Sequence, residues 1–235
     1  MSSELIPAID VAAGRLAVFS SEGPSASGAF GGDPLAAARA YVAAGARRLH
    51  VVDLDLAFSN EARNLGTVRA IAGLGVRVQG SGGIGTAEHA RAVLDAGADR
   101  VVLGSAVLAD EAAASQMISE LADRALIGIE VEGDRVRSRG RVQVDLPLVQ
   151  TLGWLVAAGA SAFLVTTVAR VGSLGGPDVD TVRRVVRAGR PVIAAGGIAS
   201  DDDLHALRDA GARGAVVGRA FLDGSLGMDD LFGSG

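Results

Sequence analysis

One stretch of this chain occurs twice, and the repeat limits the folds that the chain can adopt. Ser81-Gly-Gly-Ile84 returns 114 residues later as Ala195-Gly-Gly-Ile198, and Val102-Leu-Gly-Ser105 returns at the same spacing as Val216-Val-Gly-Arg219. Each copy can form the same supersecondary unit. The repeat therefore predicts a fold made of two similar halves.

Short apolar runs rich in β-branched residues alternate with Ala-rich stretches of helical spacing. We expect strands at residues 5–9, 49–54, 76–79, 100–103, 125–131, 162–166, 191–194 and 214–217. We expect helices between them, for example at residues 34–44, 86–96, 110–122 and 201–210, several of which end at a glycine. Eight apolar strands separated by helices predict parallel pairing. The repeat favours a (β/α)8 barrel of two four-strand halves over an open doubly wound sheet. Segment 20–32, rich in Gly and Ser, is expected to be a flexible loop.

Composition narrows the chemistry. The chain has 235 residues, 49% of them hydrophobic, and we expect residues 1–235 to form one barrel domain. It contains no Cys, and all 22 basic residues are Arg, so thiol chemistry and Schiff-base lysines are excluded. The net charge of −5 and the lack of a basic stripe argue against nucleic-acid binding. Without an apolar run long enough for a membrane span or a signal peptide, the chain is expected to be cytoplasmic. We expect a monomer with no cofactor and no metal.

The repeated glycine turns predict where an anion binds. Each Gly-Gly pair leaves a strand and enters a helix, where glycine lets backbone N–H groups approach an anion and the helix dipole favours it. The next strand of each copy ends in Gly-Ser or Gly-Arg. The candidate phosphate-binding residues are Gly82, Gly83, Gly104 and Ser105 in the first half, and Gly196, Gly197, Gly218 and Arg219 in the second. Two such sites across a barrel mouth would hold a ligand with a phosphate at each end. The alternative is that these glycines only make tight turns.

Ionisable residues at strand ends are candidates for catalysis and substrate binding. Asp10 closes the first strand and Glu130 holds the corresponding place in the second half, so the two could act as general base and general acid. A carboxylate at a strand end can equally be a helix cap or an ion-pair partner, and Asp53 has the same ambiguity. Arg139 could bind an anion or pair with a surface acid. His50, inside an apolar strand, is interpreted as a buried structural histidine.

Motifs along the whole chain resemble the ProFAR isomerase family of histidine biosynthesis (HisA), including its bifunctional form PriA, which also isomerises phosphoribosylanthranilate for tryptophan. The segments that carry the resemblance are Ile6-Pro-Ala-Ile-Asp10, Leu49-His-Val-Val-Asp-Leu-Asp55, Ser81-Gly-Gly-Ile84, Val102-Leu-Gly-Ser105, Ser138-Arg-Gly140, Leu174-Gly-Gly-Pro177, Ala195-Gly-Gly-Ile198 and Val217-Gly-Arg-Ala220. Ala57-Phe58 followed by Arg63-Asn64 is more similar to PriA.

The resemblance implies a (β/α)8 barrel that converts an N-linked phosphoribosyl aldose into the ketose, with a small bis-phosphorylated ligand. It implies catalytic roles for Asp10, Glu130 and Thr166, and substrate-binding roles for Ser81, Asp53 and Arg139. It also adds Gly176 to the phosphate-binding residues.

The chain departs from the family at several positions of the expected mouth. Val171 stands where the family has its second catalytic aspartate, and valine cannot transfer a proton. Val18 and Gly85 replace two arginines, and Arg141 replaces a tryptophan. Isomerase activity therefore requires another acid, such as Glu130 or Asp178. The alternatives are a non-catalytic paralogue that binds a phosphorylated sugar or a partner protein, and an altered reaction.

Overall fold

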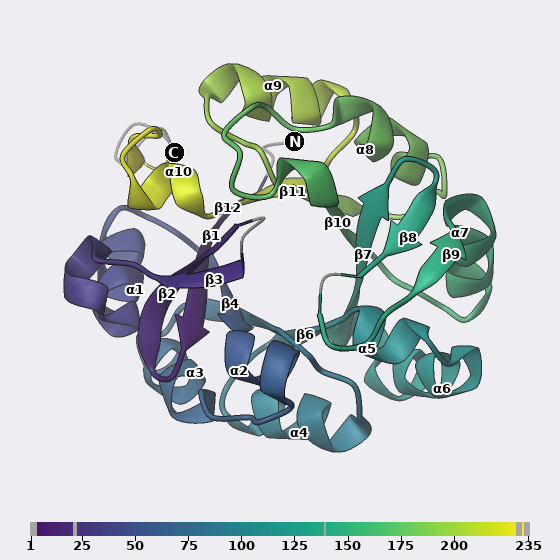
Figure 1. Ribbon diagram of the computed structural model, residues 1–235, viewed down its shortest axis with the longest axis horizontal. Helices are drawn as coiled ribbons and strands as arrows, with labels where there is room; N and C mark the ends of the chain where they lie inside the picture. The colour runs from purple at the N-terminus through teal and green to yellow at the C-terminus, as the bar shows by residue number, and fades with distance from the viewer. Residues whose placement is uncertain (1–3, 21–22, 139, 229–231, 233–235) are drawn as a thin grey trace.

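The computed structural model describes residues 4–20, 23–138, 140–228 and 232 (Figure 1). Arg139 lies outside the described residues, and so do residues 21–22 of the expected loop. Among the described helices, none combines the length and the apolar character needed to cross a membrane.

Eight parallel strands form a closed barrel, as predicted. They are β1 (Glu4–Ala12), β4 (Arg48–Asp53), β5 (Arg77–Ser81), β6 (Arg100–Leu103), β7 (Ala125–Glu132), β10 (Phe163–Thr167), β11 (Val192–Ala195) and β12 (Gly214–Val217). They pair in chain order, β12 pairs with β1, and β10 pairs with β7 to join the halves. Figure 1 looks along the barrel axis, with the strands as an inner ring and helices outside. The (β/α)8 prediction is confirmed.

The longer helices lie between the strands and cover the outside of the barrel, whereas the short helices α2, α5 and α10 begin directly after strands at one barrel end. They are α1 (Pro34–Ala43), α2 (Leu54–Ser59), α3 (Leu65–Ala72), α4 (Ala87–Asp95), α5 (Ser105–Leu108), α6 (Glu111–Leu121), α7 (Leu148–Ala157), α8 (Val179–Val186), α9 (Asp201–Asp209) and α10 (Arg219–Leu222). Local chemistry fixes their ends. Asp110 caps α6 by accepting from Ala112 and Ala113 N–H groups, and Ser200 and Asp203 form a capping box on α9.

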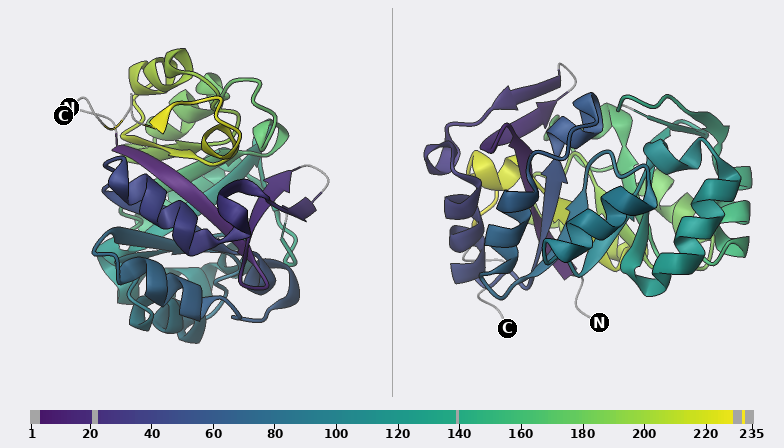
Figure 2. Two further views of the ribbon diagram at one scale, coloured as in Figure 1. Left: turned by 90° about the vertical axis from the view of Figure 1, so that its left-hand side faces the viewer. Right: turned by 90° about the horizontal axis from the view of Figure 1, so that it is seen from below.

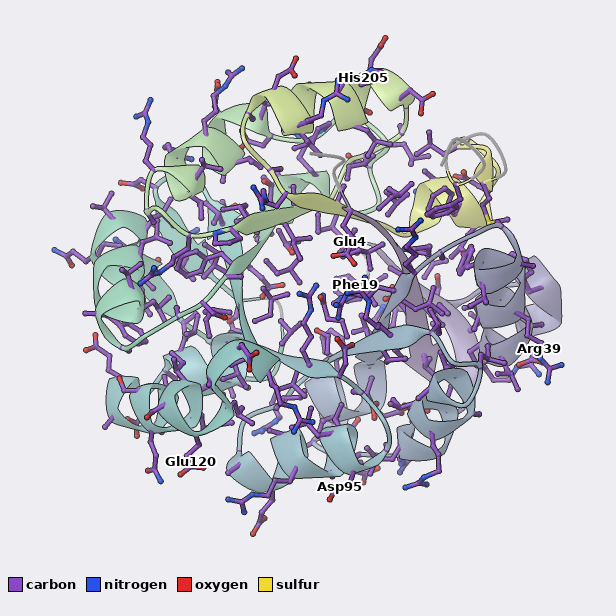
Figure 3. All side chains as sticks on the ribbon, turned by 180° about the vertical axis from the view of Figure 1, so that it is seen from behind. Glu4, Phe19, Arg39, Asp95, Glu120 and His205 are labelled. Carbon is purple, nitrogen blue, oxygen red and sulfur yellow. The ribbon has the colours of Figure 1, made fainter. Side chains whose placement is uncertain are left out.

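Two apolar layers hold the barrel together. The interior is filled by residues from alternating strand positions, namely Ile6, Ala8, Val102, Leu126, Leu164, Ile193 and Val216. A larger cluster fills the space between the strands and the helices. Figure 3 views the molecule from behind Figure 1, with Glu4 and Phe19 inside the ring and Arg39, Asp95, Glu120 and His205 on its outer side. Because these inward side chains fill the barrel interior around them, any cavity must lie towards one end of the barrel.

Two antiparallel hairpins extend the barrel and were not predicted. The first continues β1 through β2 (Arg15–Ser20) into β3 (Gly23–Ala26), and the second joins β7 to β8 (Arg135–Arg137) and β9 (Asp145–Pro147). The loop expected at residues 20–32 is therefore wrong for its described part, which contains β3 and the 3-10 helix η1 (Ala29–Gly32). Further 3-10 turns are η2 (Ala122–Arg124) and η3 (Val168–Arg170). In Figure 2 both hairpins project from the same end of the barrel.

A buried polar network joins the end of β4 to the start of α3. The Asp53 carboxylate accepts from Leu56 N, from Asn64 N and from Asn64 Nδ2 at 2.6 Å. Asn64 is only 1% exposed; its Nδ2 also donates to Asp55, and its Oδ1 accepts from Gly14 N. Asn64 thus ties α2 and the β1–β2 turn to the same barrel end.

We predict that Asn64→Ala lowers the free energy of unfolding by about 2–3 kcal/mol, because it leaves buried partners without hydrogen bonds. Chemical denaturation measures this change. Asn60→Gly is the control: Asn60 is exposed and has the left-handed conformation that glycine adopts freely, so its effect should stay within about 0.5 kcal/mol. Equal losses in both variants would contradict the role given to Asn64.

Candidate active site

A cavity of about 270 Å³ opens where the barrel strands end. All eight barrel strands contribute to its wall. The strand residues are Ala8 and Asp10, His50 and Val52, Ser81, Val102, Gly128, Ile129 and Glu130, Leu164 and Thr166, Ala195, and Val216 and Val217. The carboxyl ends of the strands carry the active sites of (β/α)8 enzymes. This cavity is therefore the candidate site.

The first glycine turn forms one side of the cavity. Gly82, Gly83, Gly104 and Ser105, here called the first cradle, all line it. Gly82 and Gly83 have φ of 97° and 63°, and a side-chain carbon on Gly83 would lie 2.3 Å from the Leu56 carbonyl oxygen. Only glycine allows this approach. Gly104 begins α5 with no side-chain cap, so the first N–H groups of that helix are left for other acceptors.

The second glycine turn forms the opposite side. Gly196, Gly197, Gly218 and Arg219, here called the second cradle, also line the cavity. The two cradles stand on β5–β6 and β11–β12, four strands apart in a ring of eight. Gly176 does not line the cavity; its N–H donates to Gly197 O at 3.0 Å, so it supports the second cradle from behind.

The predicted catalytic residues lie between the cradles. Asp10 lies near the end of β1 and Glu130 near the end of β7, on opposite walls, and Thr166 on β10 is the register partner of Glu130. Both carboxylates thus face a common space with the cradles on either side. Ser81, a predicted substrate-binding residue, lines the same cavity.

Two other acids have different places. Asp53 does not line the cavity, because its carboxylate points into the Asn64 network. Asp178 caps α8, accepting from Thr181 N at 3.0 Å and from Thr181 Oγ1 at 2.7 Å, and it is likewise outside the cavity wall. Burial alone would raise the pKa of Asp178, but the bonds from Thr181 and the charges of Arg184 and Arg170 lower it overall.

An apolar side chain occupies the wall beside the second cradle. Val171 lines the cavity in the loop that follows η3. Arg219 holds this loop by donating from Nη1 to Gly172 O at 2.6 Å, and Arg170 donates to Gly175 O within the loop. One Arg219 nitrogen is therefore hydrogen-bonded to the loop, while the residue still lines the cavity as part of the second cradle.

The rim contains Phe19, which the sequence does not point to, together with Phe58 and Arg141 of the family motifs. Phe19 and Phe58 stack with ring centroids 5.6 Å apart, and both line the cavity. Arg141 lines it too and donates from Nη2 to Asn60 Oδ1. A signal for the first hairpin was present: Ala13-Gly14, both with positive φ, form a two-residue turn before an apolar run, and this brings Phe19 to the mouth.

Comparison with known proteins agrees with this geometry. The sequence profile described as "Histidine biosynthesis protein" matches residues 4–227. A 1-(5-phosphoribosyl)-5-((5-phosphoribosylamino)methylideneamino) imidazole-4-carboxamide isomerase of Thermobifida fusca is 40% identical over 97% of this chain and 94% of its own length. The protein of the same name from Saccharopolyspora erythraea is 38% identical over 98% of each chain. Phosphoribosyl isomerase A of Streptomyces griseus is 39% identical over 97% of this chain and 95% of its own. The chain belongs to the histidine biosynthesis protein family.

Proposed function

We propose that the cavity binds a small phosphoribosyl compound with a phosphate at each end and converts it from an aldose to a ketose, an Amadori rearrangement. One observation carries this proposal above the others. The two cradles face each other across a single cavity, and Asp10 and Glu130 stand on the walls between them. A ligand held at both ends would present its sugar carbons to the two carboxyl groups.

The first step is acid catalysis. The protonated carboxyl of Glu130 gives its proton to the ring oxygen as the C1–O bond breaks and the nitrogen lone pair forms a C=N bond, which leaves an open-chain imine protonated on nitrogen. The Asp10 carboxylate then removes the proton from C2, and the electron pair forms an enolamine. Asp10 returns the proton to C1 while the C2 hydroxyl gives its proton to the Glu130 carboxylate, so the ketose forms, both carboxyl groups regain their starting states and no atom is gained or lost. Acid and base groups in such steps each contribute about 10²–10⁴-fold in rate.

The choice of Glu130 over Asp178 rests on position and hydrogen bonding. Asp178 accepts hydrogen bonds from Thr181, and its lowered pKa keeps the carboxylate ionised, so it has no proton to donate. Glu130 lines the cavity next to Thr166 in the register of β7 and β10. Since the Val171 side chain cannot transfer a proton, we assign the role of the acid to Glu130.

The names of the relatives indicate the substrates. The proteins of T. fusca and S. erythraea are named for a phosphoribosyl imidazole-4-carboxamide, and we propose the same compound, ProFAR, as the substrate here. The relative named phosphoribosyl isomerase A and the Ala57-Phe58 segment support phosphoribosylanthranilate as a second substrate.

We predict that Ser105→Asp weakens binding of ribulose 1,5-bisphosphate at least tenfold. The new carboxylate would face a phosphate in the first cradle, and two like charges about 4 Å apart repel by roughly 1–4 kcal/mol at a protein surface. Titration calorimetry measures the affinity. Ser119→Asp, on an exposed position of α6, adds the same charge away from the cavity and should leave the affinity unchanged. If Ser105→Asp bound ribulose 1,5-bisphosphate as tightly as the wild type, phosphate binding at the first cradle would be contradicted.

We predict that Asp10→Asn and Glu130→Gln each lower kcat for ProFAR by about 10²–10⁴-fold. Val171→Asp should raise kcat, since it restores an acid to the wall. Asp178→Asn serves as the control, with kcat unchanged within a few-fold, because this residue caps α8 outside the cavity. Continuous assays with ProFAR and with phosphoribosylanthranilate give the values.

A second candidate function is non-catalytic binding of a phosphorylated sugar, which the apolar Val171 favours. It predicts that wild-type protein binds ribulose 1,5-bisphosphate but turns over neither isomerase substrate. That result would end the isomerase proposal. Measurable turnover that falls in both carboxylate variants would end the non-catalytic one.

A further inference from the structure

Three polar side chains form a chain of hydrogen bonds beneath the cavity. Arg100 Nε donates to Gln79 Oε1 at 2.8 Å, and Gln79 Nε2 lies 2.7 Å from His50 Nδ1. The three residues are register neighbours on β6, β5 and β4. Gln79 is fully buried and His50 is 6% exposed, and of the three only His50 lines the cavity. The chain therefore ends at the cavity floor.

The direction of these bonds fixes the proton on His50. A guanidinium has donors and no acceptor, so the Gln79 carbonyl oxygen must face Arg100. The amide N–H of Gln79 then faces His50, and only a lone pair on Nδ1 can accept it. In a neutral imidazole with an acceptor Nδ1, the proton resides on Nε2. Nε2 is thus a hydrogen-bond donor.

The surroundings keep the ring neutral. Burial, and next the positive charge of Arg100, lower the pKa of His50 to about 4. The other ionisable groups of the cavity wall are Asp10, Glu130, Arg141 and Arg219. Among the described residues, the hydrogen bond that the His50 side chain makes is the one at Nδ1. A donor at the floor of a cavity is suited to an acceptor on a ligand.

We propose that His50 is a substrate-recognition residue whose Nε2–H donates to an uncharged oxygen, hydroxyl or carbonyl, in the sugar portion of the bound ligand. Gln79 and Arg100 are its positioning residues. The inference rests on the proposed function and adds to it a donor between the two phosphate sites. It also means that His50 does not remove the C2 proton, because its basic nitrogen is already used by Gln79.

Nitrogen-15 NMR of the whole protein, labelled in its histidines, tests the proton position directly. The chain has three histidines, and His50→Gln identifies the His50 signals by their loss. We expect a protonated Nε2, an unprotonated Nδ1 and no titration between pH 8 and pH 5. A proton on Nδ1, or titration near pH 6.5, would overturn the inference.

Two ligands separate this inference from the proposed function. Inorganic phosphate should shift the backbone amide signals of the cradle glycines and leave His50 Nε2 unchanged, whereas ribulose 5-phosphate should shift both. If ribulose 5-phosphate shifts only the signals of the cradle amides, the role of His50 is refuted and phosphate binding at the cradles is supported. If neither ligand moves the cradle amides, the proposed function fails and the recognition role fails with it.

A charge-matched pair of variants tests the positioning residues. In Gln79→Glu the carboxylate can still accept a hydrogen bond from Arg100, but it has no N–H to donate to His50. The His50 proton should therefore move from Nε2 to Nδ1, or the ring should bind a second proton. We expect the NMR signature of Nδ1–H and at least tenfold weaker binding of ribulose 5-phosphate. Gln150→Glu, exposed on α7, should change neither. An unchanged His50 spectrum in Gln79→Glu would overturn the positioning role.

Discussion

The cavity depends on how closely backbone approaches backbone at two glycine turns. A side-chain carbon on Gly83 would lie 2.3 Å from the Leu56 carbonyl oxygen, and one on Gly197 would lie 2.2 Å from that of Gly176. Any other residue would push the turn away from the loop it rests on. Because each turn leads from a barrel strand into a helix, this close contact also determines where free N–H groups face, and so where an anion can be held.

The two halves share this backbone and differ in the side chains around it. Ser105 in the first half corresponds to Arg219 in the second, and Asp10 faces Glu130 across the mouth. Backbone amides can hold a phosphate whatever side chains surround them. The two halves can therefore bind phosphate in the same way although the side chains of the cavity wall differ. Val171 is one such change, and in our proposal the acid is instead Glu130, which lies on β7 of the same half.

Much of the fold was predictable from the sequence, because the barrel strands are apolar and their glycine turns repeat. The hairpins are not predictable from the pattern, because β3 and β9 are short and lack an apolar alternation, and because the Gly/Ser content of segment 20–32 is typical of a loop. For the site, the motifs located the strand ends but not the direction of each side chain. Asp53 ends β4 and Asp10 lies near the end of β1, yet Asp53 turns to Asn64 and Asp10 lines the cavity. Likewise the sequence presents His50 as a buried histidine, and only its bond to Gln79 reveals a fixed donor.

A crystal structure with ribulose 1,5-bisphosphate bound would show whether both cradles hold a phosphate. We expect one phosphate within hydrogen-bond distance of the N–H groups of Gly83 and Ser105, and the other at those of Gly197 and Arg219. The sugar would span the space between Asp10 and Glu130. A bisphosphate held by only one cradle, or bound outside the barrel mouth, would contradict binding by both cradles.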